Sequence, residues 1–251
     1  MRQLCIVTGA AEGTGLAVAQ RFARAGWAVC ITSRSAEKAQ TAAAQIAKEY
    51  RMPAYGVGVN PARREDVQAL YQAVDARAVP LGAIVLVAAD LGMNQPALDT
   101  ALADWERVIQ TNVIWNYLLA REAARRMQNT GGAIVIVGSN TAVRAIPNRS
   151  AYIASKGALS ALSRALAVEL GPMQVRSNVV VCGNIQNERF FALDKTAQKA
   201  RRCRAPLGDF AAYEDVAELC FFLGTDASRV ITGTEIALDG GVLAQLTPSR
   251  Q

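Results

Sequence analysis

The sequence predicts an α/β fold in which about seven parallel strands form one doubly wound sheet with helices on both faces. Short apolar runs alternate with longer segments of helical periodicity along all 251 residues, a pattern that is typical of parallel sheets. The short runs have no alternating polar face, so we expect their strands to be buried on both sides. No linker, repeat or low-complexity segment interrupts the alternation, and we therefore expect one domain spanning residues 1–251.

Each expected strand is rich in apolar and β-branched residues, and each expected helix repeats its apolar residues every three or four positions. Strands are expected at residues 4–7, 28–32, 55–59, 83–88, 133–137, 175–181 and 235–238. Helices are expected at residues 16–25, 36–50, 64–77, 102–127, 152–170 and 213–223. Gly171 and Pro172 end the helix over 152–170, because glycine suits the position after a helix and proline cannot continue it.

The composition excludes several classes of protein. The chain has no histidine, which rules out a serine-histidine-acid triad and the usual histidine-bearing zinc sites. Its five cysteines form no C-x-x-C pair, so we interpret them as small buried hydrophobes and expect no metal site. The net charge of +6 comes mostly from dispersed arginines that do not alternate with aromatic residues, which argues against nucleic-acid binding.

Apolar runs are too short for a membrane protein. The longest, residues 83–89, falls far below the roughly 20 residues that a membrane-spanning helix needs. The apolar start at residues 4–7 is also too short for the core of a signal peptide. We therefore expect no membrane association and a cytoplasmic protein.

A glycine-rich turn joins the first strand to the first helix. The segment TGAAEGTG, residues 8–15, predicts a dinucleotide site, since the start of the following helix offers free N–H groups to a phosphate. We expect one glycine to make the tight turn, the second to let a phosphate approach, and the third to let the helix pack closely on the strand. The expected cofactor contacts here are Gly9, Glu12, Gly13, Thr14 and Gly15.

The end of the second strand predicts which dinucleotide binds. Ser33 and Arg34 stand where an acidic residue would hydrogen-bond a free ribose 2′-hydroxyl, whereas arginine suits a 2′-phosphate. This favours NADP(H) over NAD(H) as the cofactor. A solvated arginine at a strand end is the alternative, and Glu12 nearby argues mildly against additional negative charge.

Tyr152 and Lys156 are candidates for acid–base chemistry in a chain without histidine. Residues four apart share a helix face, so the Lys156 ammonium is expected beside the phenol. Lowering the pKa of a tyrosine from about 10 to about 7 costs roughly 4 kcal/mol, and a unit charge about 4 Å away supplies about that much at an effective dielectric near 20. Tyr152 is therefore expected to exchange a proton with a ketone or an alcohol near neutral pH. The same spacing also occurs by chance in many helices.

Two polar residues elsewhere in the chain strengthen this hypothesis. Ser139 follows the strand at 133–137, where its hydroxyl would hold the substrate oxygen. Asn112 is a polar residue within the otherwise apolar part of the helix at 102–127. Alternatively, Asn112 is a helix side chain that forms a hydrogen bond with a partner in the core.

Taken together, these motifs resemble the short-chain dehydrogenase/reductase family over essentially the whole chain. The shared features are T-G-x-x-x-G-x-G at residues 8–15, Asn112, Ser139, and Y-x-x-x-K at Tyr152 and Lys156. The resemblance implies a Rossmann-type fold and a hydride transfer between a nicotinamide and a carbonyl or alcohol. It further implies that Tyr152 is the acid/base, that Lys156 lowers the pKa of Tyr152 and binds the nicotinamide ribose, that Ser139 positions the substrate, and that Asn112 holds a water of the proton relay. Within the family, the chain resembles the 3-oxoacyl-ACP reductase-like and related carbonyl reductases.

The chain departs from the family pattern at four places. Family members usually carry N-N-A-G after the fourth strand, where this chain has Ala88, Ala89, Asp90 and Leu91. The aspartate expected near the adenine is Asn60, the P-G after the sixth strand is Cys182-Gly183, and the threonine expected to contact the nicotinamide amide is Asn187. By resemblance, Asn60, Ala88, Ala89, Gly183 and Ile185 also belong to the cofactor site, together with Tyr152 and Lys156. A catalytically impaired regulatory protein that binds a dinucleotide is the alternative function.

The resemblance assigns the substrate lid to residues 187–210. Phe190, Phe191 and Leu193 are candidates for an apolar pocket there, and Lys195, Lys199, Arg201, Arg202 and Arg204, with Arg144 and Arg149 outside the lid, are candidates for contacts with an anionic or acyl-carrier-linked substrate. A solvated helix face is the alternative interpretation of the basic residues in the lid. Small residues along 154–165 favour close helix packing between subunits, and by resemblance we expect a homotetramer or homodimer.

Overall fold

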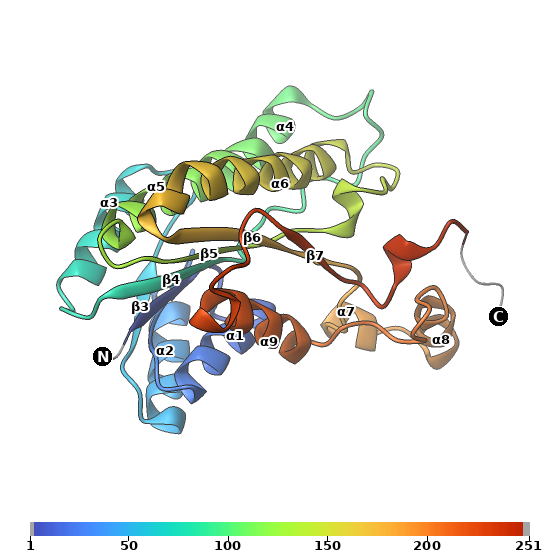
Figure 1. Ribbon diagram of the computed structural model, residues 1–251. Helices are drawn as coiled ribbons and strands as arrows, with labels where there is room; N and C mark the ends of the chain where they lie inside the picture. Colours follow the sequence, from blue (N-terminus) through green and yellow to red (C-terminus); the bar gives the residue numbers. More distant parts are fainter. Residues whose placement is uncertain (1–2, 248–251) are drawn as a thin grey trace.

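The computed structural model describes residues 3–247 and contains one seven-stranded sheet in which all strands are parallel (Figure 1). The strands are β1 (Leu4–Val7), β2 (Ala28–Ser33), β3 (Ala54–Gly58), β4 (Leu81–Leu86), β5 (Gly132–Val137), β6 (Val175–Cys182) and β7 (Glu235–Leu238). Their order across the sheet is β3-β2-β1-β4-β5-β6-β7. The predicted doubly wound fold is confirmed. From β1 the chain adds β2 and β3 on one side and then returns to add β4 to β7 on the other side. The strand order therefore switches between β1 and β4, and folds of this kind bind their ligands at such a switch point.

Helices cover both faces of the sheet (Figure 1). They are α1 (Gly13–Arg24), α2 (Ala36–Tyr50), α3 (Glu65–Asp75), α4 (Leu102–Ile109), α5 (Trp115–Met127), α6 (Ser150–Leu170), α7 (Glu188–Phe191), α8 (Lys195–Arg202) and α9 (Tyr213–Gly224). Helices α1, α2 and α9 pack on one face, and α3, α5 and α6 pack on the other. No helix among residues 3–247 is both long enough and apolar enough to span a bilayer.

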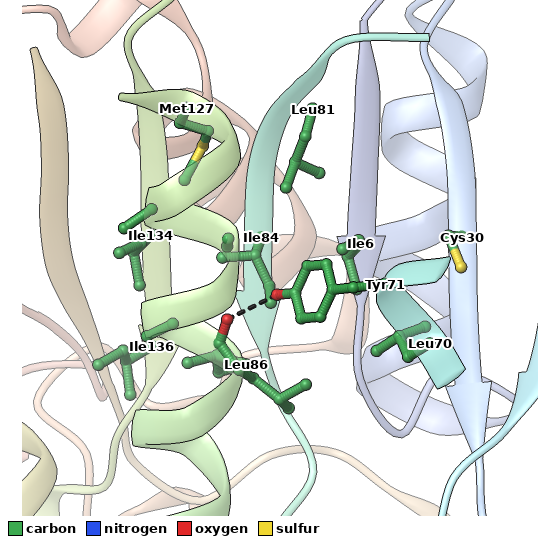
Figure 2. Close-up of a cluster of buried hydrophobic side chains, with 14 of the residues drawn as sticks. Ile6, Cys30, Leu70, Tyr71, Leu81, Ile84, Leu86, Met127, Ile134 and Ile136 are labelled. Carbon is green, nitrogen blue, oxygen red and sulfur yellow. Dashed lines mark hydrogen bonds between the residues drawn. The ribbon is translucent and has the colours of Figure 1, made fainter. Parts of the chain in front are cut away.

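Two apolar clusters, one on each face, hold the layers together. The cluster beneath α3, α5 and α6 includes the branched side chains that β4 and β5 present to this face (Figure 2). Tyr71 of α3 is buried in it, and its hydroxyl donates a 2.6 Å hydrogen bond to the main-chain oxygen of Leu119. Because a buried phenol needs a partner for its O–H group, this bond lets a polar tip enter an apolar core.

The expected helix over 102–127 is interrupted. Residues Gln110–Ile114 form a turn of π-helix between α4 and α5. A π turn inserts one extra residue and rotates the rest of the helix about its axis, and such turns are frequent at functional sites. Asn112 lies in this turn and is fully buried.

Candidate active site

The candidate residues gather at the edge of the sheet where the parallel strands have their carboxyl ends. Thr8 and Gly9 follow β1, Ala88 follows β4, Ser139 follows β5, and Gly183 follows β6. Parallel order brings these ends together even though Thr8 and Gly183 are 183 − 8 = 175 positions apart in the sequence. The fold therefore assembles one site from segments that the sequence presents separately.

The turn after β1 has the backbone that the glycine motif predicts. Gly9 and Gly13 have φ angles of +62° and +57°, a left-handed conformation that costs glycine little. A Cβ added to Gly15 would lie 2.3 Å from the main-chain oxygen of Gly9, so only glycine permits this contact. Glu12 precedes the first turn of α1, and its side chain does not cap that turn. The N–H groups at the start of α1, next to Thr14, thus stay available to an anion.

Thr8 ties this turn to the segment after β4. Its hydroxyl oxygen accepts hydrogen bonds from the main-chain N–H groups of Val87, at 2.9 Å, and Ala88, at 3.1 Å. Ala88 in turn lies directly against Gly9, since a Cβ on that glycine would be 3.1 Å away from it. The segment that departs from the family pattern at Ala88 and Ala89 is therefore held by a residue of the glycine motif itself.

Asn112 fixes the next residues of the same segment. Its Oδ1 accepts a 2.7 Å bond from the N–H of Asp90, and its Nδ2 donates 2.9 Å bonds to the oxygen of Asp90 and to the hydroxyl of Ser155. The main-chain oxygen of Asn112 accepts a 2.7 Å bond from Nδ2 of Asn116. These contacts hold the segment after β4 against the π turn, and the water-holding role that the resemblance implies for Asn112 stays a prediction.

The carboxylate of Asp90 stabilises the segment further. It pairs with Arg107 of α4 and accepts a 2.8 Å hydrogen bond from the N–H of Gly92. Arg149 donates bonds of 3.0 and 3.1 Å to the main-chain oxygens of Leu91 and Gly92. Several side chains thus order this loop without the usual N-N-A-G residues.

Ser33 and Arg34 stand at the carboxyl end of β2. The hydroxyl of Ser33 accepts a 3.3 Å bond from the N–H of Ser35. Arg34 is exposed and has no hydrogen-bond or ion-pair partner among residues 3–247. On the neighbouring strand end, Asn60 is exposed, and its Oδ1 accepts a 3.0 Å bond from the N–H of Ala62. The guanidinium of Arg34 is therefore a cation without a protein partner at this end of the site within the described chain.

Ser139 and Tyr152 meet across the gap between β5 and α6. The Ser139 hydroxyl accepts a 3.2 Å bond from the N–H of Thr141 and lies 2.8 Å from the Thr141 hydroxyl. Tyr152 lies in the first turn of α6 and is partly buried. Burial raises the pKa of Tyr152 above its usual 10, and a hydrogen bond with Ser139 opposes that rise.

The expected electrostatic effect of Lys156 on Tyr152 is not found in this structure. Lys156 is 3% exposed, and its Nζ donates a 2.7 Å hydrogen bond to the main-chain oxygen of Val137. The ammonium lies 5.7 Å from the centroid of the Tyr152 ring. Burial lowers the pKa of Lys156 from 10.5 to about 8. The prediction that the ammonium lowers the pKa of Tyr152 was therefore wrong for the polypeptide alone, because burial raises this pKa, Ser139 and Arg149 are what oppose the rise, and the ammonium is directed at Val137.

Gly183 and Ile185 form the wall of the site after β6. A Cβ on Gly183 would lie 2.7 Å from that of Asp239, so the two strand ends approach closely here. Ile185 pairs with Ala211 in an isolated β-bridge. Cys182 is buried, which raises the pKa of its thiol to about 11. The side chain of Asn187 accepts a 3.0 Å bond from the N–H of Phe190 and caps α7.

A cavity of about 380 Å³ opens between Ser139, Tyr152 and the segment after β6. Its lining consists of Leu91, Ser139, Asn140, Thr141, Ile146, Arg149, Tyr152, Gly183, Asn184, Ile185, Asn187, Arg189, Phe190, Arg201 and Phe210. This size falls within the range of small-molecule sites. Sequence reasoning missed Arg189 and Phe210, which carry no motif, although both lie within the predicted lid.

Residues 187–210 cover one side of this cavity with α7 and α8, which lie beyond the end of the sheet (Figure 1). Phe190 is buried and lines the cavity, and Leu193 packs against the same small cluster. Phe191 is 58% exposed and does not line the cavity. The prediction that Phe190, Phe191 and Leu193 share one pocket is therefore correct only in part.

Of the basic residues predicted to contact an anionic substrate, two line the cavity and five do not. Arg149 and Arg201 line the cavity. Arg144 donates instead to the main-chain oxygen of Leu243, and Arg202 pairs with Asp209. Lys195, Lys199 and Arg204 do not line the cavity. No group of three or more metal-ligating side chains gathers anywhere in residues 3–247.

Comparisons with known proteins give a consistent picture. Residues 9–243 match the family model described as enoyl-(acyl carrier protein) reductase. The chain is 30% identical to the 3-oxoacyl-[acyl-carrier-protein] reductase FabG of Aquifex aeolicus, over 96% of this chain and 97% of that protein.

Solved structures agree in fold. A short-chain type dehydrogenase/reductase from Mycobacterium marinum superposes with a TM-score of 0.88 at 30% identity and covers 97% of this chain and 96% of its own. A gluconate 5-dehydrogenase from Burkholderia cenocepacia, in complex with NADP and tartrate, superposes with a TM-score of 0.89 at 26% identity over 97% of this chain and 96% of its own. The chain has a glycine-rich turn suited to a phosphate, a serine–tyrosine pair at one cavity, and matches over nearly its full length. It therefore belongs to the short-chain dehydrogenase/reductase family, whose members are oxidoreductases that use a nicotinamide cofactor to interconvert CH–OH and C=O groups.

Proposed function

We propose that this protein is an NADP(H)-dependent oxidoreductase that transfers a hydride between the nicotinamide and a ketone or secondary alcohol, with Tyr152 as the general acid/base. The observation that carries the proposal is that Ser139 and Tyr152 open together on one cavity of about 380 Å³. The same cavity is bounded by Gly183 and Ile185, two residues expected to contact the nicotinamide. A substrate oxygen and the cofactor would thus meet where the phenol is available.

The residues at the ends of β1 and β2 fit a dinucleotide. The start of α1 offers main-chain N–H groups for the pyrophosphate, and Gly15 removes the side chain that would block the turn. Arg34, free of protein partners within the described chain, is suited to a ribose 2′-phosphate. Ser33, Asn60, Ala88 and Ala89 border the same end of the sheet. When bound there, the nicotinamide supplies or accepts the hydride.

The side chains supply the proton and the orientation. In the direction of reduction, the Ser139 hydroxyl hydrogen-bonds the carbonyl oxygen, and Tyr152 donates its proton as negative charge develops there. Because the pKa of Tyr152 is raised, the phenol is protonated at neutral pH and ready to donate. With a pKa of about 8, Lys156 is mostly protonated at pH 7, so its ammonium is suited to hold the nicotinamide ribose. The positive charge of an oxidised nicotinamide would favour the reverse, base role.

Replacing Tyr152 by Phe tests the assigned role. The hydroxyl is lost with little change in shape, so we expect NADPH affinity to stay nearly constant while turnover falls by several orders of magnitude. Binding is measured by fluorescence titration, and turnover by reduced-nicotinamide absorbance with a panel of ketones and alcohols. Equal activity in the variant would exclude Tyr152 as the acid. NADPH binding without turnover of any compound would favour the regulatory alternative, which the named relatives do not support.

Replacing Arg34 by Asp tests the cofactor preference. An acidic residue repels a 2′-phosphate and accepts hydrogen bonds from a free 2′-hydroxyl, so preference should move toward NADH. The ratio of kcat/KM values for the two cofactors measures the change. Arg51→Asp, at the far end of α2, is a control for the change in net charge. A ratio that Arg34→Asp leaves unchanged would show that Arg34 does not bind the phosphate.

Further parts of the proposal concern assembly and place in the cell. We infer a cytoplasmic homotetramer or homodimer built from one domain, with residues 187–210 as its lid. Val168 on α6 and Val230 before β7 are 79% and 81% exposed, and packing between copies would bury both. Light scattering coupled to size-exclusion chromatography measures the mass, and a monomeric mass at micromolar concentration would contradict this inference.

A further inference from the structure

The cavity beside Tyr152 has a strongly one-sided charge. Arg149, Arg189 and Arg201 line it, and no aspartate or glutamate is among the described residues that do so. The other polar lining residues, such as Asn140 and Thr141, are neutral. With three arginines and no acidic residue in its described lining, the cavity attracts an anion rather than a cation.

Two of the three guanidinium groups have no partner. The side chains of Arg189 on α7 and Arg201 on α8 make no hydrogen bond, ion pair or ring contact within residues 3–247. Their neighbour Arg202 differs, since its Nε lies 3.0 Å from an oxygen of Asp209 and its guanidinium lies over the ring of Phe190. The lid therefore neutralises the arginine that faces Asp209 and leaves uncompensated the two that line the cavity.

Arg149 serves a different purpose from this pair. Its guanidinium donates to the main-chain oxygens of Leu91 and Gly92, so it orders the loop after β4 and adds positive potential at the wall. The two lid arginines retain all their donors. A guanidinium binds a carboxylate or phosphate through two parallel N–H···O bonds, which gives both affinity and orientation.

We propose that the substrate is a small oxo or hydroxy compound with a carboxylate or phosphate group, and that Arg189 and Arg201 bind this anionic group while Ser139 and Tyr152 hold the reacting oxygen. This inference rests on the proposed function and narrows its substrate class. The cavity volume of about 380 Å³ is near the lower end of the usual range for ligand sites, which favours a free small anion over a long acyl chain. Arg189 and Arg201 are then specificity-determining residues on the lid.

Matched substrates test the proposal directly. Steady-state kinetics with NADPH compare 2-, 3- and 4-oxo acids with their methyl esters, and dihydroxyacetone phosphate with dihydroxyacetone. Each pair keeps the ketone and differs in the anionic group. The 3- and 4-oxo acids separate the effect of the charge from the activation that an adjacent ester gives a 2-oxo group, and the two series distinguish carboxylate from phosphate. We expect the wild type to prefer the anion of at least one pair. The double variant Arg189→Gln/Arg201→Gln should lose about tenfold or more of that preference, since it removes the charge-assisted hydrogen bonds to the anionic group.

The control is Lys195→Gln/Lys199→Gln, which removes the same charge from α8 at positions that do not line the cavity. It should retain the preference for the anion. The proposal is overturned if the control loses as much preference as the arginine variant, if the arginine variant keeps its preference, or if the wild type prefers neutral compounds. Efficient turnover of acyl-carrier thioesters without turnover of free anions would overturn it as well.

A binding measurement separates this inference from the proposed function. Succinate contains no ketone or alcohol to react, and calorimetric titration should detect its binding to the wild type and to Lys195→Gln/Lys199→Gln but much weaker binding to Arg189→Gln/Arg201→Gln. If succinate binds in this way but no carbonyl compound is turned over, the anion site stands and the proposed reaction fails. If neutral ketones are turned over while succinate binding is absent or the same in all three proteins, the reaction stands and the anion site fails.

Discussion

Replacing Lys156 by Met should change how the stability of the protein depends on pH. The folded protein holds the Lys156 proton less tightly than the unfolded chain does, because burial lowers the pKa from 10.5 to about 8. The resulting penalty is present in full below pH 8 and is relieved as the pH rises from about 8 toward 10.5. Methionine is similar in length, can fill the same space, and does not titrate.

The magnitude can be worked from the two pKa values. At pH 7, a depression from 10.5 to about 8 costs the folded state roughly 3 kcal/mol, and at pH 9.5 about 1.4 kcal/mol of this remains. The free energy of unfolding of the wild type should therefore rise by about 2 kcal/mol relative to Lys156→Met over this range. Loss of the hydrogen bond to Val137 adds an offset that does not depend on pH, so it drops out when the two pH values are compared. Lys156 lowers the pKa of Cys182, but with a pKa of about 11 this buried thiol stays protonated at pH 9.5 with or without Lys156.

Urea denaturation followed by tryptophan fluorescence measures both proteins at pH 7 and pH 9.5, since Trp115 is buried and reports on the core. Lys195→Met, on the exposed face of α8, controls for the loss of one surface charge. A difference between wild type and Lys156→Met that is the same at both pH values would refute the argument that burial depresses the pKa of Lys156.

Three further substitutions test other parts of the structure. Gly15→Ala should weaken both folding and NADPH binding, because its Cβ would lie 2.3 Å from the oxygen of Gly9; thermal melting and cofactor titration measure this, and a variant with wild-type values for both would show that the turn can relax. Asn112→Ala should cost about 2–4 kcal/mol, since the N–H and C=O groups of Asp90 lose their partner; a loss below about 0.5 kcal/mol in urea denaturation would mean that this segment is held by other contacts. Tyr71→Phe should cost about 1 kcal/mol, the net value of one buried hydrogen bond, and an unchanged unfolding midpoint would count against that bond.

The fold could be predicted from the sequence because its signals are local. Buried parallel strands lack alternation and surface helices have a period near 3.6 residues, so each element is recognisable by itself. The π turn at Gln110–Ile114 could not be predicted in this way, since a single extra residue leaves the apolar pattern of a helix almost unchanged. Asn112 in this turn forms hydrogen bonds with Asp90, a contact between residues 22 positions apart that no local pattern indicates.

The candidate site was predictable in membership and less so in electrostatics. Residue type and spacing made Ser139 and Tyr152 candidates, and the structure brings both to one cavity. The effect of Lys156 on the pKa of Tyr152 was misjudged because an estimate from charge and distance leaves out the desolvation of the buried phenol. In addition, no pattern in the sequence indicates that the ammonium donates its hydrogen bond to the oxygen of Val137. Arg189 was missed because an exposed arginine on a short helix has the same signal whether it faces solvent or a cavity.

The small apolar cluster of Phe190, Ala205 and Phe210 is separate from the two large clusters that join the helices to the sheet. Changes in this outlying cluster can reshape the cavity wall without weakening the layers that align Ser139 and Tyr152. A chimaera that carries the corresponding segment of a related enzyme would therefore be expected to fold with its proton donor in place and to accept different compounds. Evolution can therefore change which substrate such a scaffold binds while the reaction that it catalyses stays the same.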